Sequence, residues 1–182
     1  MTTVGQIERL TQNRVVALFQ KQLDYDYLGN WEERETNSNI EEDILRKYLT
    51  ERGYSQTLIG KAIYELTHAA TNQSKSLYDI NKDVYTLLRY GVKVKEEVGE
   101  NTRTVWLIDW ENPENNHFAI AEEITVRGEN KKRPDVVLYV NGIALVRWNL
   151  NAVPYPFPKG FARTSTTRSR FLSVRFLPLF NW

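Results

Sequence analysis

The sequence predicts an α/β fold in which N-terminal helices precede a mixed or antiparallel sheet. Three observations support this prediction. Apolar residues recur at helical spacing through much of the first 90 residues. Residues with a high preference for strands dominate several segments after residue 101. Two of these segments flank Asn141-Gly142, which is a strong signal for a tight β-hairpin turn.

The first helix is expected over residues 6–23. Its apolar face is expected to contain Ile7, Leu10, Val15, Leu18 and Phe19, which form an amphipathic helical pattern. The aromatic segment that follows, residues 24–31, is interpreted as a loop packed on the core. The first element is therefore expected to be an amphipathic helix with no strand directly after it.

Three further helices have recognisable ends. Ser38 and Glu41 have the spacing of a capping box, in which each residue satisfies a backbone N–H of the other. Gly53 marks the expected end of the helix that they open. Ser55 is expected to cap the next helix, and the last helix covers residues 76–90. The sequence thus predicts a helical region before the sheet.

The candidate strands are residues 102–110, 117–126, 134–140 and 143–148. With Asn141-Gly142 as a two-residue turn, residue 135 is expected to face residue 148, and residue 149 is expected to lie diagonal to Asp135. Asp135 stands at the start of a buried strand, where a carboxylate costs several kcal/mol unless it is paired or bound to a metal. We therefore take Asp135 as the first candidate functional residue.

Composition excludes several classes of protein. The chain has 182 residues, of which 41% are hydrophobic and 26% charged, which is typical of a single soluble domain. No apolar run approaches the roughly 18 residues of a membrane span and no signal-peptide pattern is present, so we expect a cytoplasmic protein without a membrane partner. The absence of cysteine excludes disulfides and thiolate chemistry. Gly60-Lys61-Ala62 lacks the other residues of a nucleotide phosphate loop, so no such loop is expected there.

The net charge of +1 divides into two unlike parts. Residues 1–146 contain 18 basic and 23 acidic residues, whereas residues 147–182 contain six basic residues and no acidic one. The second part also holds four of the six prolines and five of the seven phenylalanines. The simplest interpretation of such a tail is a nucleic-acid anchor. The two parts are treated as a domain and an aberrant basic tail.

Five segments of the chain resemble the N-terminal domain of the R subunit of type I restriction-modification enzymes. They read TQNRVVALF, SNIEEDILRKYLTERGYS, SLYDINKDVYTLLRYG, HFAIAEEITVRG and RPDVVLYVNGIAL. The resemblance implies a PD-(D/E)xK core, similar to restriction endonucleases, and Mg²⁺-dependent cleavage of unmodified DNA. It also implies ATP-driven translocation by a motor outside this chain, with ATP bound only there. The implied partners are DNA and the methyltransferase and specificity subunits.

The resemblance also implies which residues form the site. Asp135 corresponds to the metal-binding carboxylate of the motif. An acidic residue on the first conserved helix is expected to help bind the metal, and Glu42 fits best, with Glu41 as the alternative. The family has Glu-x-Lys after the turn, but this chain has Asn149 and Asn151 at those positions. Each loss could lower the rate by several orders of magnitude, since one electrostatic donor is worth about 10²–10³. An inactive remnant is expected.

A change of reading frame near residues 145–147 would explain both the altered site and the unusual tail. Trp148 is encoded by TGG and codons for Asn begin with AA, so reading one base earlier makes codon 149 GAA, which encodes Glu. The same frame permits Lys at codon 151. The hypothesis implies a truncated domain whose sheet is incomplete on its C-terminal side. The alternatives are a non-catalytic remnant that binds DNA or partner subunits, and a pseudogene product without function.

Overall fold

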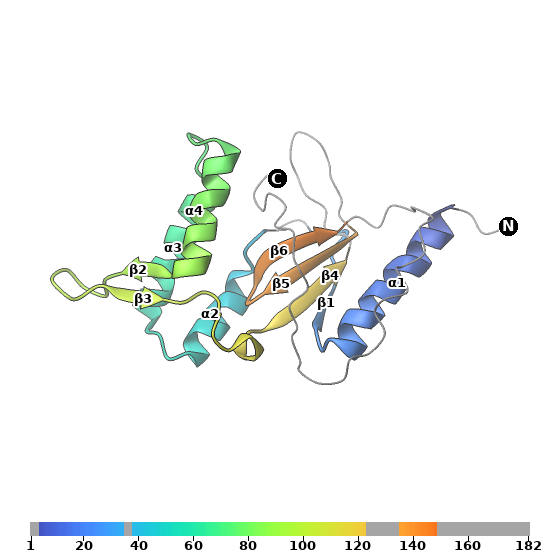
Figure 1. Ribbon diagram of the computed structural model, residues 1–182, viewed down its shortest axis with the longest axis horizontal. Helices are drawn as coiled ribbons and strands as arrows, with labels where there is room; N and C mark the ends of the chain where they lie inside the picture. The colour runs from blue at the N-terminus through green and yellow to red at the C-terminus, as the bar shows by residue number, and fades with distance from the viewer. Residues whose placement is uncertain (1–3, 35–37, 123–134, 149–182) are drawn as a thin grey trace.

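The computed structural model describes residues 4–34, 38–122 and 135–148, and it has an α/β fold (Figure 1). Its main sheet has four strands in the order β1-β4-β5-β6. These strands are β1 (Asp26–Asn30), β4 (Phe118–Glu122), β5 (Val136–Val140) and β6 (Ile143–Trp148). Strand β1 is parallel to β4, and the other neighbours are antiparallel. The predicted mixed sheet is therefore confirmed for the described residues.

Four α-helices and a small second sheet complete the described part of the chain. The helices are α1 (Val4–Gln22), α2 (Glu42–Glu51), α3 (Gln56–Ala70) and α4 (Leu77–Tyr90). The second sheet pairs β2 (Val92–Val94) with β3 (Arg103–Val105), and the short 3₁₀ helix η1 (Pro113–Asn115) precedes β4. Figure 1 shows α1 at one end of the molecule and α3, α4, β2 and β3 at the other. Both groups pack on the main sheet or on α2.

Helix α1 covers one face of the main sheet. Its buried face consists of Gln12, Val15, Val16 and Phe19, which have the i, i+3, i+4, i+7 spacing of a single helical stripe. The expected apolar face was partly wrong, because Leu10 and Leu18 are exposed by 52% and 39%. One polar residue, Gln12, therefore takes a position that an apolar residue would ordinarily occupy.

The largest core lies between α2, α3, α4 and the small sheet. Its buried members include Leu49 of α2, Leu66 of α3 and Val84 of α4, and Ile143 connects it to the main sheet.

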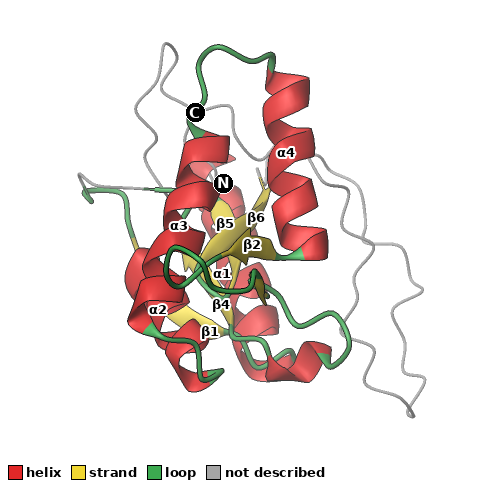
Figure 2. Ribbon diagram, turned by 90° about the vertical axis from the view of Figure 1, so that its left-hand side faces the viewer, coloured by secondary structure: helices red, strands yellow, loops and turns green. Residues whose placement is uncertain are grey.

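The predicted caps of two helices are confirmed. The Ser55 side chain accepts a hydrogen bond from the Leu58 N–H, and the Ser76 side chain accepts one from the Asp79 N–H. Figure 2 shows α3 and α4 side by side in this region.

The predicted capping box before α2 is wrong. The Ser38 hydroxyl accepts a hydrogen bond from the Ile40 N–H at 3.1 Å. The Glu41 side chain makes no capping hydrogen bond to the backbone of α2. Instead, both oxygens of Glu41 bind the guanidinium of Arg34, at 3.1 Å and 2.8 Å. Arg34 in turn lies over the ring of Trp31, 4.1 Å from its centre. A charged partner in the preceding loop has therefore replaced the local cap.

Two strand predictions need correction. Residues 26–30, interpreted as loop, form β1, because pairing with β4 supplies hydrogen bonds that compensate for poor strand formers such as Gly29. The strand expected over residues 102–110 is only β3, three residues long, and its partner β2 was not predicted. The expected strand at 117–126 corresponds to β4, and its last four residues lie outside the described part.

No helix in the described ranges is long and apolar enough to cross a lipid bilayer.

Candidate functional site

Asp135 directly precedes β5, at the end of the main sheet farthest from the hairpin turn. The residue is partly buried, and its backbone carbonyl accepts a hydrogen bond from Gln12 Nε2 at 3.3 Å. The polar residue on the buried face of α1 therefore contacts the backbone of the first candidate functional residue. The position of Asp135 at the start of a buried strand agrees with the sequence prediction.

The hairpin that follows has the predicted turn but not the predicted register. Asn141 and Gly142 have φ angles of 51° and 82°, and positive values at both central residues are typical of a type I′ turn. A β-bulge shifts the pairing beside Leu138, so that Trp148 faces Val136 and not residue 135. Asn149 and Asn151 lie outside the described residues. The bulge was not predicted because no residue in this segment specifies one.

Gly142 could not be replaced by a larger residue without movement of α2. A Cβ atom at this position would lie 2.6 Å from the Glu41 carbonyl oxygen and 3.0 Å from the Leu45 nitrogen. The Gly142 carbonyl also accepts a hydrogen bond from the Glu41 N–H at 2.7 Å. The N-terminus of α2 therefore packs directly on the hairpin turn, which determines where the acidic residues of that helix lie.

Glu42 is the first residue of α2, and the structure does not bring it to Asp135. Its side chain is 53% exposed and pairs with Arg46 at 3.4 Å. Because α2 begins at the turn, all of β5 separates the two carboxylates, and five strand residues span about 17 Å. Glu41, the alternative, also lies at the turn and is bound by Arg34. Neither glutamate shares a site with Asp135 in the described structure.

A different carboxylate lies at the Asp135 end of the sheet. Glu122, the last residue of β4, pairs in register with Val136, which follows Asp135. It is 6% exposed, and its two oxygens accept hydrogen bonds from Gln12 Nε2 at 2.8 Å and the Tyr27 hydroxyl at 2.9 Å. Burial and the bond to Glu122 raise the pKa of Tyr27 to about 12. One amide of α1 thus contacts both Glu122 and the Asp135 backbone.

Sequence reasoning missed Gln12, Tyr27 and Glu122. A signal did exist for Glu122, because a glutamate interrupts the otherwise apolar start of the strand HFAIAEEITV. No comparable signal existed for Gln12, whose role depends on which side of α1 faces the sheet. Its partner is 110 residues away in the chain, so only the folded structure brings the two together.

Mg²⁺ prefers several oxygen ligands, commonly one or two carboxylates with waters and substrate phosphates. Within the ranges that the structure describes, no three His, Asp or Glu residues are grouped closely enough to hold a metal ion. Both oxygens of Glu122 already accept hydrogen bonds, and Glu42 is at the other end of the hairpin. The described residues alone therefore do not fit a magnesium site, and we derive no reaction step through one.

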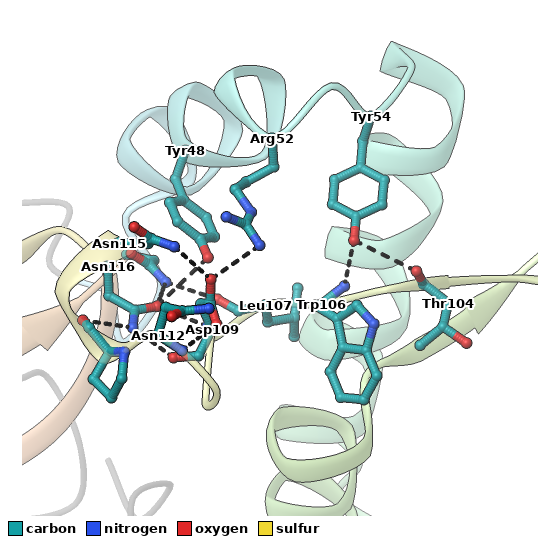
Figure 3. A network of polar contacts seen from close by, with 12 residues as sticks. Tyr48, Arg52, Tyr54, Thr104, Trp106, Leu107, Asp109, Asn112, Asn115 and Asn116 are labelled. Atoms are coloured by element: carbon teal, nitrogen blue, oxygen red, sulfur yellow. Dashed lines mark hydrogen bonds and ion pairs between the residues drawn. The ribbon is translucent and has the colours of Figure 1, made fainter.

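A polar network around the buried residues Asp109 and Asn116 lies at the turn end of the same hairpin (Figure 3). The carboxylate of Asp109 binds Arg52 at 3.0 Å and accepts hydrogen bonds from the Asn112 N–H and Asn115 Nδ2, both at 2.9 Å. Hydrogen bonds from Asn112 and Asn115, aided by the charge of Arg52, lower the pKa of Asp109. Asn116 connects this segment to the hairpin, because its amide nitrogen donates to the Asp109 carbonyl at 2.8 Å and its amide oxygen accepts a hydrogen bond from Asn141.

Asn141, the first turn residue, completes this network. Its Nδ2 donates to the Leu107 carbonyl at 2.9 Å and to Asn116 Oδ1 at 2.8 Å. Its Oδ1 accepts a hydrogen bond from the His117 N–H at 2.8 Å. Asn116 Oδ1 also lies 3.5 Å from the Tyr48 hydroxyl of α2. One asparagine therefore connects the β5–β6 turn, the segment before β4 and, through Asn116, helix α2.

The described structure is thus an α/β domain in which an aspartate begins the first strand of a fixed hairpin. Residues 6–147 match the family described as the type I restriction enzyme R protein N terminus. Because this match covers most of the 182 residues, the chain belongs to that family. The match ends beside the point where the charge composition changes.

Two curated relatives agree with this assignment. The chain is 41% identical over 70 residues to the type I restriction enzyme MjaIXP endonuclease subunit of Methanocaldococcus jannaschii. It is 34% identical over 74 residues to the type I restriction enzyme HindI endonuclease subunit of Haemophilus influenzae. These alignments cover 35% and 38% of this chain and 7% of each relative. The chain therefore aligns with only a small part of these subunits.

Proposed function

We propose that residues 1–146 form a nuclease-type domain of PD-(D/E)xK lineage that no longer cleaves DNA. The observation that carries the proposal is Asp135 at the start of the first strand of a type I′ hairpin, in a chain of the R-subunit N-terminal family. Asn149 and Asn151 stand where the resemblance places Glu and Lys. The second metal-binding carboxylate and the cation that positions the attacking water are then both missing.

The intact relative would bind Mg²⁺ and cut unmodified DNA while a motor region hydrolyses ATP. DNA and the methyltransferase and specificity subunits would be its partners. In this chain both asparagines are neutral, so one carboxylate that would hold the metal and one cation that would stabilise the phosphate transition state are missing. The lineage therefore implies a DNA-directed domain whose chemistry has been lost.

We further propose that the change at residues 145–147 is a shift of reading frame. Three observations support it. The family match ends at residue 147, and residues 147–182 contain no acidic residue. In addition, the frame read one base earlier makes codon 149 encode Glu. The test is the nucleotide sequence across codons 144–152. We expect restoration of the frame to yield Glu-x-Lys and an open reading frame that continues into a helicase motor. A restored frame that soon meets a stop codon would refute this proposal.

A further inference from the structure

A groove lies between α3 and β2, on the side of the molecule away from α1. We call it the lysine groove; it has a volume of about 420 Å³ and is lined chiefly by Gly60, Lys61, Tyr64, Lys93 and Lys95. In Figure 1, α3 and β2 lie at the opposite end of the molecule from α1, which contacts the Asp135 backbone. The lysine groove is therefore separate from the site described above.

Lys93 of β2 and Lys95, which directly follows this strand, provide two cations. Both residues are exposed, whereas Val94 between them is buried, as expected for alternating residues of a strand. Residues two apart on a strand are separated by roughly 6.6 Å. The two ammonium groups can therefore contact different phosphates of one nucleic-acid strand.

Lys61 provides a third cation whose position is fixed. Its Nζ donates to the carbonyl of Lys95 at 2.7 Å and to that of Glu96 at 2.9 Å. An ammonium group has three N–H donors, so these two bonds leave a third for a ligand. Apart from its chain neighbours and the backbone of its own helix, no atom lies within 4 Å of the position that a Cβ of Gly60 would occupy, so the groove is open at this point.

Tyr64 adds an exposed aromatic ring beside these cations. Its side chain is 65% exposed, and its ring stacks on His68 with centres 5.9 Å apart. Surfaces that bind single nucleic-acid strands combine cationic side chains with exposed rings on which bases stack. The lysine groove has both features.

The residues that line the groove have a net positive charge, although the domain is acidic. Glu65 also lines the groove, so three lysines face one carboxylate. The neighbouring Glu96 is paired with Arg103 at 3.6 Å. Residues 1–146 contain five more acidic than basic residues, so the groove is a local exception on this domain. A phosphate-bearing ligand matches this charge.

We propose that the lysine groove binds the phosphates of a DNA strand, independently of Asp135. The choice of DNA among phosphate-bearing ligands rests on the proposed function. The groove is not a nucleotide phosphate loop, because Gly60 and Lys61 lie inside α3 and not in a loop before a helix. Binding here would hold DNA against the domain without contributing to cleavage.

The test is DNA binding by the full chain, measured by fluorescence anisotropy in EDTA so that cleavage plays no part. The probes are a labelled duplex of about 20 base pairs and the corresponding single strand, titrated between about 50 and 200 mM salt. The test variant is Lys93→Ala with Lys95→Ala, and the charge-matched control is Lys47→Ala with Lys82→Ala, which are exposed on α2 and α4. Labelled ATP serves as the probe for a free nucleotide.

We expect the Lys93/Lys95 variant to bind both DNAs more weakly, with the slope of log K against log salt reduced by about 1.8 for the duplex. The control should bind as the unmodified chain does. Absence of DNA binding by the unmodified chain, an unchanged slope in the variant, or an equal loss in the control would overturn the proposal. Binding of ATP without DNA would overturn the choice of DNA.

Two further measurements separate a loss of DNA binding at the lysine groove from a loss of fold. Thermal unfolding followed by circular dichroism identifies a variant that has lost its fold, and Lys93→Gln with Lys95→Gln then replaces the alanine pair. Tyr64→Ala is expected to weaken binding of the single strand more than binding of the duplex, because only unpaired bases can stack on the ring. Since the assay contains no Mg²⁺, its result does not depend on whether the domain can cleave DNA.

Discussion

Replacement of Asn141 by alanine should destabilise the domain by about 4 kcal/mol. The residue is fully buried and its side chain makes three hydrogen bonds of 2.8–2.9 Å, each worth about 1 kcal/mol net. Its φ of 51° lies in the left-handed region, which costs alanine about 1 kcal/mol more than asparagine or glycine. The total is a large fraction of the roughly 5–15 kcal/mol that stabilises a typical domain.

Urea unfolding of the full chain, followed by tryptophan fluorescence, measures this loss. Asn141→Gly is the control, because glycine accepts the left-handed conformation but also lacks the amide. We expect the glycine variant to be more stable than the alanine variant by about 1 kcal/mol, and both to be far less stable than the unmodified chain. A loss of less than about 1 kcal/mol in Asn141→Ala would refute the role assigned to the network.

Three further outcomes follow from the structure. Gly142→Ala should lower stability by more than about 2 kcal/mol in the same assay, because its Cβ would meet the Glu41 carbonyl. The lowered pKa of Asp109 means that its carboxylate stabilises the fold at higher pH, and this contribution is lost as the carboxylate is protonated below about pH 4. Asp109→Asn should therefore make the free energy of unfolding depend less on pH in that range. Tyr27→Phe should remove one tyrosine that titrates at about pH 12, as followed by ultraviolet absorbance. If the absorbance change near pH 12 is the same in the variant, the bond between Tyr27 and Glu122 is contradicted.

Elements whose signals are local could be predicted from the sequence. Ser55 and Ser76 cap their helices as expected, and Asn141-Gly142 forms the expected turn. Elements that depend on distant partners could not be predicted. Strand β1 contains Gly29 and forms because β4 lies beside it, and the capping box before α2 gave way to an ion pair with Arg34.

The candidate site likewise contains one residue whose position the sequence predicts and others whose positions depend on distant contacts. The place of Asp135 before a buried strand follows from the pattern of the sequence, and the structure agrees. Glu42 was chosen because it is acidic and lies on a helix, but the packing of α2 on Gly142 places it at the far end of the hairpin. Gln12 and Glu122 were missed because their contact joins α1 to the end of β4.

Cleavage of supercoiled plasmid by the full chain in Mg²⁺ tests the central claim most directly, with Asp135→Ala as the matched variant. The proposal that Asn149 and Asn151 replace a Glu and a Lys of the family predicts that neither protein nicks or linearises the plasmid above the rate in EDTA. Mg²⁺-dependent turnover by the unmodified chain that Asp135→Ala abolishes would contradict the claim that this nuclease-type domain is inactive.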